Sequence, residues 1–123
     1  MTEEERRKEA RRRKAAEKLG STSSRCVICG EADSRCLEIH HIAGRKFGTE
    51  TVPVCRNCHR KLSDDQRDHP APVGGEPSLL ERIGQFLLGL ADLLQLAVEK
   101  LKEFGLALIE KAGTDADTPP QTA

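Results

Sequence analysis

Two pairs of cysteines are the most conspicuous chemical feature of this chain. Cys26 and Cys29 form one C-x-x-C pair, and Cys55 and Cys58 form a second. A C-x-x-C pair places two thiolates at the spacing that one tetrahedral Zn²⁺ ion requires, and two pairs complete a four-thiolate site. Because such a site leaves no ligand position open, we expect a structural zinc ion here.

Three of the four histidines are close to these pairs in the sequence. His40 and His41 form a doublet between the pairs, and His59 directly follows Cys58. A neutral imidazole can bind a metal ion or accept a proton near neutral pH. The same residues could also cap a hairpin or donate to a backbone carbonyl, so the sequence alone leaves a structural role open.

The residues between the two pairs predict a β-hairpin followed by a helix. Residues 36–42 alternate well enough for a strand, with His40 and His41 on opposite faces. Residues 51–54 are β-branched and contain Pro53, which is typical of an edge strand. A helix is expected from residue 56 to about 65, and Cys36 is expected to be a buried or half-buried thiol.

The N-terminal residues 2–19 predict a charged helix. Thr2 and Glu5 fit a capping box, and Gly20 fits the C′ position. The helix has almost no apolar face, which favours a solvated helix or frayed tail. The alternative is a basic arm that contacts phosphates through Arg6, Arg7, Arg11, Arg12, Arg13 and Lys14.

The C-terminal third predicts a long amphipathic helix after a linker rich in proline and glycine. Ser78 and Glu81 give a second capping box. Apolar residues then follow a heptad pattern, which we call the seam: Leu80, Ile83, Leu87, Leu90, Leu94, Ala97, Leu101, Phe104 and Leu108. Self-association, or pairing with a helical partner, through the 80–108 seam is the favoured interpretation, ahead of packing on the metal domain and of binding at a membrane surface. Charged residues interrupt every window long enough for a transmembrane span.

Taken together, the knuckle C-x-x-C-G, a strand ending in H-H-I and the segment V-P-V-C-x-x-C-H resemble the HNH nuclease family. The resemblance covers about residues 25–65 and implies an α+β fold, a small zinc-stabilised ββα-metal domain flanked by an N-terminal charged helix and a long C-terminal amphipathic helix. The expected organisation is a charged helical arm and hinge (1–24), the HNH-like zinc domain (25–67), a linker (68–77), the heptad helix (78–113) and a disordered tail (114–123).

The resemblance also implies a metal-dependent endonuclease that hydrolyses DNA phosphodiester bonds. By motif position, His41 corresponds to the general base, and His40 and His59 correspond to ligands of a second divalent ion, Mg²⁺, Mn²⁺ or Zn²⁺. Asp64 is a candidate for an additional ligand. The chain departs from the family at two places: the usual asparagine is replaced by Glu50 or Thr51, and the usual second histidine of the helix by Ser63.

Charge and composition indicate in which compartment the protein works and which residues could contact a nucleic acid. The net charge is zero, but residues 1–24 carry eight basic and five acidic side chains, and residues 70–123 carry four and eight. The odd cysteine count and the absence of an apolar leader favour a reducing, cytoplasmic compartment. Five basic residues near the proposed site are candidates for nucleic-acid contact, or form an ordinary solvated face: Arg45, Lys46, Arg56, Arg60 and Lys61. Two other functions stay open, a catalytically inactive nucleic-acid-binding module and an oligomerising adaptor.

Overall fold

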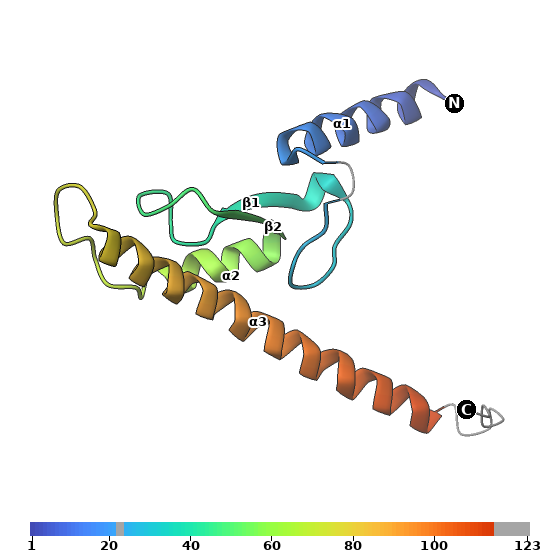
Figure 1. Ribbon diagram of the computed structural model, residues 1–123. Helices are drawn as coiled ribbons and strands as arrows, with labels where there is room; N and C mark the ends of the chain where they lie inside the picture. The colour runs from blue at the N-terminus through green and yellow to red at the C-terminus, as the bar shows by residue number, and fades with distance from the viewer. Residues whose placement is uncertain (22–23, 115–123) are drawn as a thin grey trace.

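The computed structural model describes residues 1–21 and 24–114, which form helices around one small hairpin (Figure 1). In chain order the elements are α1 (Glu3–Leu19), the 3₁₀ helix η1 (Ser34–Cys36), β1 (Leu37–His41), β2 (Thr51–Cys55), α2 (Arg56–Gln66) and α3 (Leu79–Thr114). The predicted mixture of helices with a small sheet is therefore confirmed. Residues 22–23 of the predicted hinge and residues 115–123 of the predicted disordered tail lie outside the described residues.

The hairpin brings the two cysteine pairs to the same place. β1 and β2 are antiparallel, with Leu37 opposite Cys55 and His41 opposite Thr51. The amide of Val27 donates to the carbonyl of Pro53 at 3.1 Å, so the first cysteine knuckle adds to the outer edge of β2. A proline cannot donate a hydrogen bond but its carbonyl can accept one, which suits an edge position. The first pair therefore lies beside the second.

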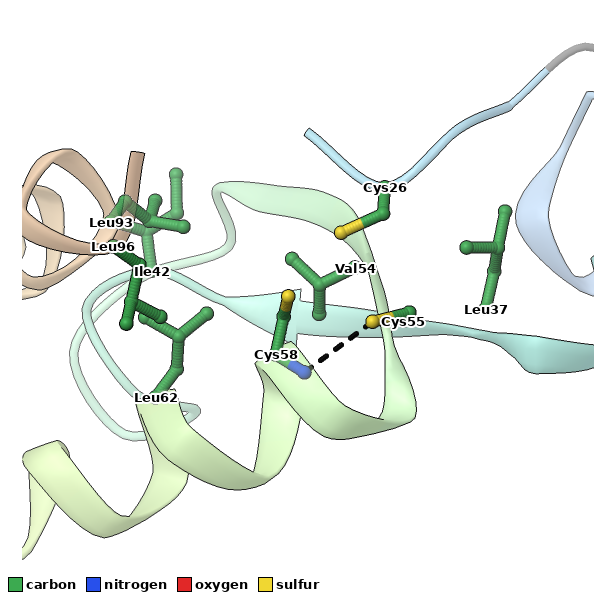
Figure 2. Packing of buried hydrophobic residues seen from close by; sticks show 9 residues of the cluster. All are labelled: Cys26, Leu37, Ile42, Val54, Cys55, Cys58, Leu62, Leu93 and Leu96. Atoms are coloured by element: carbon green, nitrogen blue, oxygen red, sulfur yellow. Dashed lines mark hydrogen bonds between the residues drawn. The ribbon is translucent and has the colours of Figure 1, made fainter. Parts of the chain in front are cut away.

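The core lies between the hairpin, α2 and the first half of α3 (Figure 2). Val54 and Leu62 are completely buried, and Ile42, Leu93 and Leu96 pack around them. The buried cysteines extend this cluster at its other end. A core of this size buries little apolar surface, and small domains of this kind usually depend on a metal ion or a disulfide for stability.

Helix α1 begins with the predicted capping box, in which Thr2 and Glu5 exchange hydrogen bonds, and ends at Gly20 with a φ of 77°. As expected for a solvated helix, nearly all of its residues are exposed, but one side of the helix is anchored to the domain. Ala16 is buried, and the hydroxyl of Ser34 in η1 donates to the carbonyl of Arg12 at 3.1 Å. Small side chains on one face of α1 let it approach η1 and β1, on the side of the hairpin away from α2 (Figure 1).

Helix α3 packs its first half against α2 and the end of β1. Gly89 sits directly against the backbone of Ile42: a Cβ at this position would overlap the Ile42 carbonyl oxygen and lie 2.7 Å from its carbon. Glycine is thus the residue that lets the two backbones come so close. Gln85, Leu93 and Leu96 on the same face are buried.

The predicted linker is tied to the start of α3. The Gln85 amide donates to the carbonyl of Pro70 at 2.9 Å, and the amide of Val73 donates to the Glu81 carboxylate at 3.0 Å. Ser78 caps the helix by accepting from the amide of Glu81 at 3.2 Å. These bonds fold the linker back so that α3 runs across the domain rather than away from it.

The seam borders the face of α3 that packs. Seven of its nine residues are exposed, Ala97 is half-buried, and Leu90 is half-buried and packs against the core cluster. Packing on the metal domain therefore uses mainly other residues of the same helix, with Leu90 at the border. The second half of α3 extends past the rest of the domain (Figure 1). None of the helices in the described part of the chain has an apolar stretch that would span a bilayer.

Candidate metal centre and the histidine pair

The four predicted zinc cysteines converge. The sulfur atoms of Cys26, Cys29, Cys55 and Cys58 all lie within 4.8 Å of one another, and those of Cys29 and Cys55 are 3.6 Å apart. In a tetrahedron with Zn–S bonds of about 2.3 Å, neighbouring sulfur atoms are about 3.8 Å apart. The arrangement therefore fits one zinc ion without rearrangement of the backbone.

Each knuckle presents its first sulfur to a backbone amide three residues later. The Cys29 amide donates to the sulfur of Cys26 at 3.5 Å, and the Cys58 amide donates to the sulfur of Cys55 at 3.4 Å (Figure 2). Such bonds stabilise negative charge on sulfur. The first sulfur of each pair is therefore placed as a zinc ligand usually is, because zinc binds the thiolate form.

The cysteine pKa values differ with surroundings. Burial raises the pKa of Cys26, but hydrogen bonds from backbone amides, that of Cys29 first, outweigh burial and lower this pKa to about 7. Burial raises the pKa of Cys29 and, more strongly, that of Cys58, and contacts with neighbouring cysteines raise both further. A bound Zn²⁺ ion would offset these effects, because coordination deprotonates a thiol. Cys36, expected to be at least half-buried, is exposed instead.

His40 and His59 face each other. Their ring centroids are 5.3 Å apart, and the ring planes form an angle of 72°. His40 is on the face of β1 that α2 covers and is only 2% exposed, whereas His59 lies in the first turn of α2 and is half-buried. The strand and the helix thus bring together two residues that are 19 positions apart in the sequence.

Glu38 orients the ring of His59. Its carboxylate Oε1 lies 3.2 Å from His59 Nδ1. A carboxylate accepts hydrogen bonds, so this contact favours a proton on Nδ1 and leaves Nε2 as the ring nitrogen that Glu38 does not contact. Metal-binding histidines usually have this arrangement, because a carboxylate behind the ring fixes its tautomer and orientation.

His40 is held in its neutral form. Burial lowers its pKa to about 4, with further lowering from His59 and His41, while Asp92 opposes the shift. The ring is therefore uncharged at neutral pH and has a lone pair available. A neutral imidazole is the form that binds a metal ion.

The other members of the predicted second metal site are not gathered around this pair. Among residues 1–21 and 24–114, the only group of three or more histidine, cysteine or acidic ligands within metal-binding range is the cysteine cluster. Asp64 is exposed on α2 and does not form such a group with His40 and His59. In the described residues the structure thus brings His40 and His59 together without a third histidine, cysteine or acidic ligand beside them.

His41 follows His40 on the strand and is half-buried. Its carbonyl accepts a hydrogen bond from the Gln66 amide at 3.0 Å, which links the end of β1 to the end of α2. The loop after it is closed by a bond from the amide of Ile42 to the carbonyl of Glu50 at 3.1 Å. Backbone hydrogen bonds thus close the loop in a chain that lacks the expected asparagine.

The five predicted nucleic-acid contacts divide into two places. Arg45 and Lys46 are exposed in the loop between the strands, and Arg56, Arg60 and Lys61 are exposed on α2. Arg56 also lines a groove between α1 and β1 that the sequence did not predict. The sequence feature that could have indicated this cationic surface is the spacing of Arg11, Lys14 and Lys18. This spacing places three cations on one face of a helix.

A second unpredicted contact joins the linker to α3. Nε2 of His69 lies 2.6 Å from Oδ2 of Asp92, and both side chains are partly buried. Nearby, burial raises the pKa of Asp65, and the negative charge of Asp92 adds to the effect.

Comparison of the chain with family models, with curated proteins and with solved structures finds no significant match.

Proposed function

We propose that this chain is a zinc-stabilised ββα-metal protein of the HNH type that hydrolyses DNA phosphodiester bonds. The observation that carries the proposal is the facing pair His40 and His59, with Glu38 behind one ring. A structural zinc ion on the four cysteines would hold the hairpin against α2 and so fix the distance between these rings. The cysteine site is closed, whereas the histidine pair leaves coordination positions open.

The reaction needs an activated water, neutralisation of charge on the phosphate and stabilisation of the leaving oxygen. A divalent ion, when bound at the histidine pair, would supply the last two. His40 and His59 would each donate one lone pair, with Glu38 holding His59 in the required orientation. His41 would accept the proton of the attacking water, a role worth about 10²–10⁴ in rate.

Plasmid nicking tests this proposal. Zinc-loaded protein should nick a supercoiled plasmid when Mg²⁺, Mn²⁺ or extra Zn²⁺ is added, and His41→Ala should lower the rate by about 10²-fold or more. Asn57→Ala is the matched control, because Asn57 is exposed on the same helix as His59 and lies outside the pair. Equal nicking by His41→Ala and the parent protein would contradict the proposed role of His41.

A catalytically inactive nucleic-acid-binding module is the second candidate. The observation that favours it is the lack of a third protein ligand beside His40 and His59 in the described residues. This candidate predicts a DNA mobility shift without cleavage in any of the three metals. A Co²⁺ titration of zinc-loaded protein separates the two candidates further. Binding of Co²⁺ by the parent protein that is lost in His59→Ala would show that the histidine pair binds a metal ion, as the nuclease requires.

We also propose that two copies of the chain associate through the seam on α3. Leu80, Leu87, Leu94, Leu101 and Leu108 occupy equivalent heptad positions and are all exposed. A heptad seam of this kind is complementary to a second copy of itself, because each apolar residue fits between residues of the facing helix. An exposed apolar stripe of this length is otherwise costly for a protein in water.

A further inference from the structure

A groove of about 430 Å³ lies between α1 and β1, and five cationic side chains line it. They come from three parts of the chain: Arg11, Lys14 and Lys18 from α1, Arg35 from η1 and Arg56 from the start of α2. Glu38 is the one acidic side chain among the lining residues. Positive charge therefore gathers here although the chain as a whole has no net charge.

The packing of α1 creates this concentration of charge. Ala15 and Leu19 belong to the groove lining and Ala16 is buried, so the helix is fixed in one rotation about its axis. Residues 11, 14 and 18 then fall on one helical face, and that face points into the groove.

Most of these cations have no acidic partner. Within the described residues, Arg11, Lys14, Lys18 and Arg56 form no ion pair, whereas Arg35 pairs with Asp33 at 2.7 Å. Hydrogen bonds from Arg35 lower the pKa of Asp33 to about 2, so this pair stays ionised over the whole neutral range. Four unpaired positive charges are left facing one groove.

We propose that this groove binds the phosphodiester backbone of a single nucleic-acid strand. Regularly spaced phosphates are the ligand that matches several cations arranged along a channel, because each contact releases a condensed counterion. A channel between one helix and one strand fits a single backbone, and single-strand-binding proteins use positively charged grooves of this kind.

The groove and the histidine pair share one neighbouring residue. Glu38 is among the residues that line the groove, and its carboxylate Oε1 lies 3.2 Å from His59 Nδ1. His40 and His59 themselves do not line the groove. The binding assignment therefore stands independently of the proposed catalysis.

Fluorescence anisotropy with a labelled single-stranded DNA of about 16 nucleotides tests the proposal, using full-length, zinc-loaded protein without added metal. The variant Arg11→Gln/Lys14→Gln/Lys18→Gln should raise Kd about tenfold or more and reduce the slope of log K against log salt by about 2. Glutamine keeps a good helix propensity, so the helix itself should be retained.

A matched variant removes the same charge from other faces of α1. Arg6→Gln/Arg12→Gln/Arg13→Gln also loses three positive charges, but none of these residues lines the groove. It should raise Kd by no more than about threefold, since only the general attraction of the helix is reduced. Equal losses in the two variants would mean diffuse charge attraction and would overturn the proposal.

A second pair of variants does not depend on the folding of α1. Arg56→Gln removes a cation of the groove, and Arg67→Gln removes an exposed cation at the other end of α2, outside the groove. Only the first should weaken binding of the oligonucleotide. Failure of the parent protein to bind it, or tighter binding of a duplex of the same sequence, would also overturn the single-strand assignment.

Failure of this proposal is distinguishable from failure of the nuclease. His59→Ala leaves the groove cations in place, so it should bind the oligonucleotide as the parent does while losing any metal-dependent nicking. Binding without nicking in the parent would reject hydrolysis and keep the groove. Nicking that is unchanged by the three groove substitutions, with unchanged Kd, would reject the groove and keep hydrolysis.

Discussion

Replacement of Gly89 by alanine should destabilise the protein, although alanine is the better helix former. The change removes a glycine from a helix interior, which by itself would add about 1 kcal/mol to the free energy of unfolding. The new Cβ, however, would overlap the carbonyl oxygen of Ile42 and lie 3.3 Å from its Cγ2 atom. The overlapping partner is backbone, which cannot rotate away, so α3 must move off the end of β1.

The cost of that movement can be estimated from the packing. Overpacking of a well-packed site costs about 1–3 kcal/mol, and the upper end applies where backbone has to shift. Leu93 and Leu96 on the same face would also lose part of their burial. Subtracting the gain in helix propensity leaves a net loss of about 2 kcal/mol in the free energy of unfolding. The urea midpoint should fall by about 1 M.

Gly84→Ala is the matched control for this measurement. Gly84 is exposed in the same helix, and nothing lies within 4 Å of the Cβ that alanine would add. It should therefore stabilise the protein by up to about 1 kcal/mol, opposite in sign to Gly89→Ala. Both proteins would be unfolded in urea at the same free zinc concentration, followed by circular dichroism. A Gly89→Ala protein as stable as the Gly84→Ala protein would refute the close backbone contact.

Three further predictions concern the metal sites and the seam. Cys58→Ser, or removal of zinc from the parent by a chelator, should abolish cooperative thermal unfolding, because zinc binding supplies folding free energy that the small core lacks; calorimetry and metal analysis check this. Glu38→Gln should weaken Co²⁺ binding at His59 by about 10–100-fold in a titration of zinc-loaded protein, because the ring loses its charged partner. Leu87→Glu/Leu94→Glu should shift the protein to the monomer in sedimentation equilibrium and leave its thermal stability at low concentration within about 0.5 kcal/mol of the parent.

Each of these predictions has its own control. Cys36→Ser changes an exposed thiol outside the cluster and should keep zinc; loss of zinc in this variant would contradict the four-cysteine assignment. Asn57→Ala should leave Co²⁺ binding unchanged, and a loss equal to that of Glu38→Gln would point to a general effect on α2. Gln95→Glu is exposed on α3 outside the seam, so association that it abolishes equally would not run through the seam.

Patterns that act over a few residues allowed much of the fold to be predicted. The spacing within each C-x-x-C pair led to the four-sulfur cluster, and Thr2 with Glu5 led to the start of α1. The alternation of residues 36–42 and the position of Pro53 led to the hairpin. In each case the physical cause is local: the reach of a side chain, the period of a strand or a missing amide.

Contacts between distant segments were not predictable in the same way. Nothing near Gly89 in the sequence indicates that the backbone of Ile42 will lie against it, and a glycine in a helix usually suggests only flexibility. The contact between His69 and Asp92 likewise depends on the path of the linker. The packing of α1 was missed because Ala16 is too small to give an apolar face that a hydrophobic pattern would detect.

The two faces of α3 have a consequence for how the protein would act on a long polymer. The domain occupies one face, while seven of the nine seam residues beside it are exposed, so pairing of two chains through these residues would leave most of the packing of each domain in place. A pair would then carry two identical centres on one rigid rod. Once the first domain had bound, the second would meet the same polymer at a high effective concentration. The pair would therefore bind the polymer more tightly than one domain does.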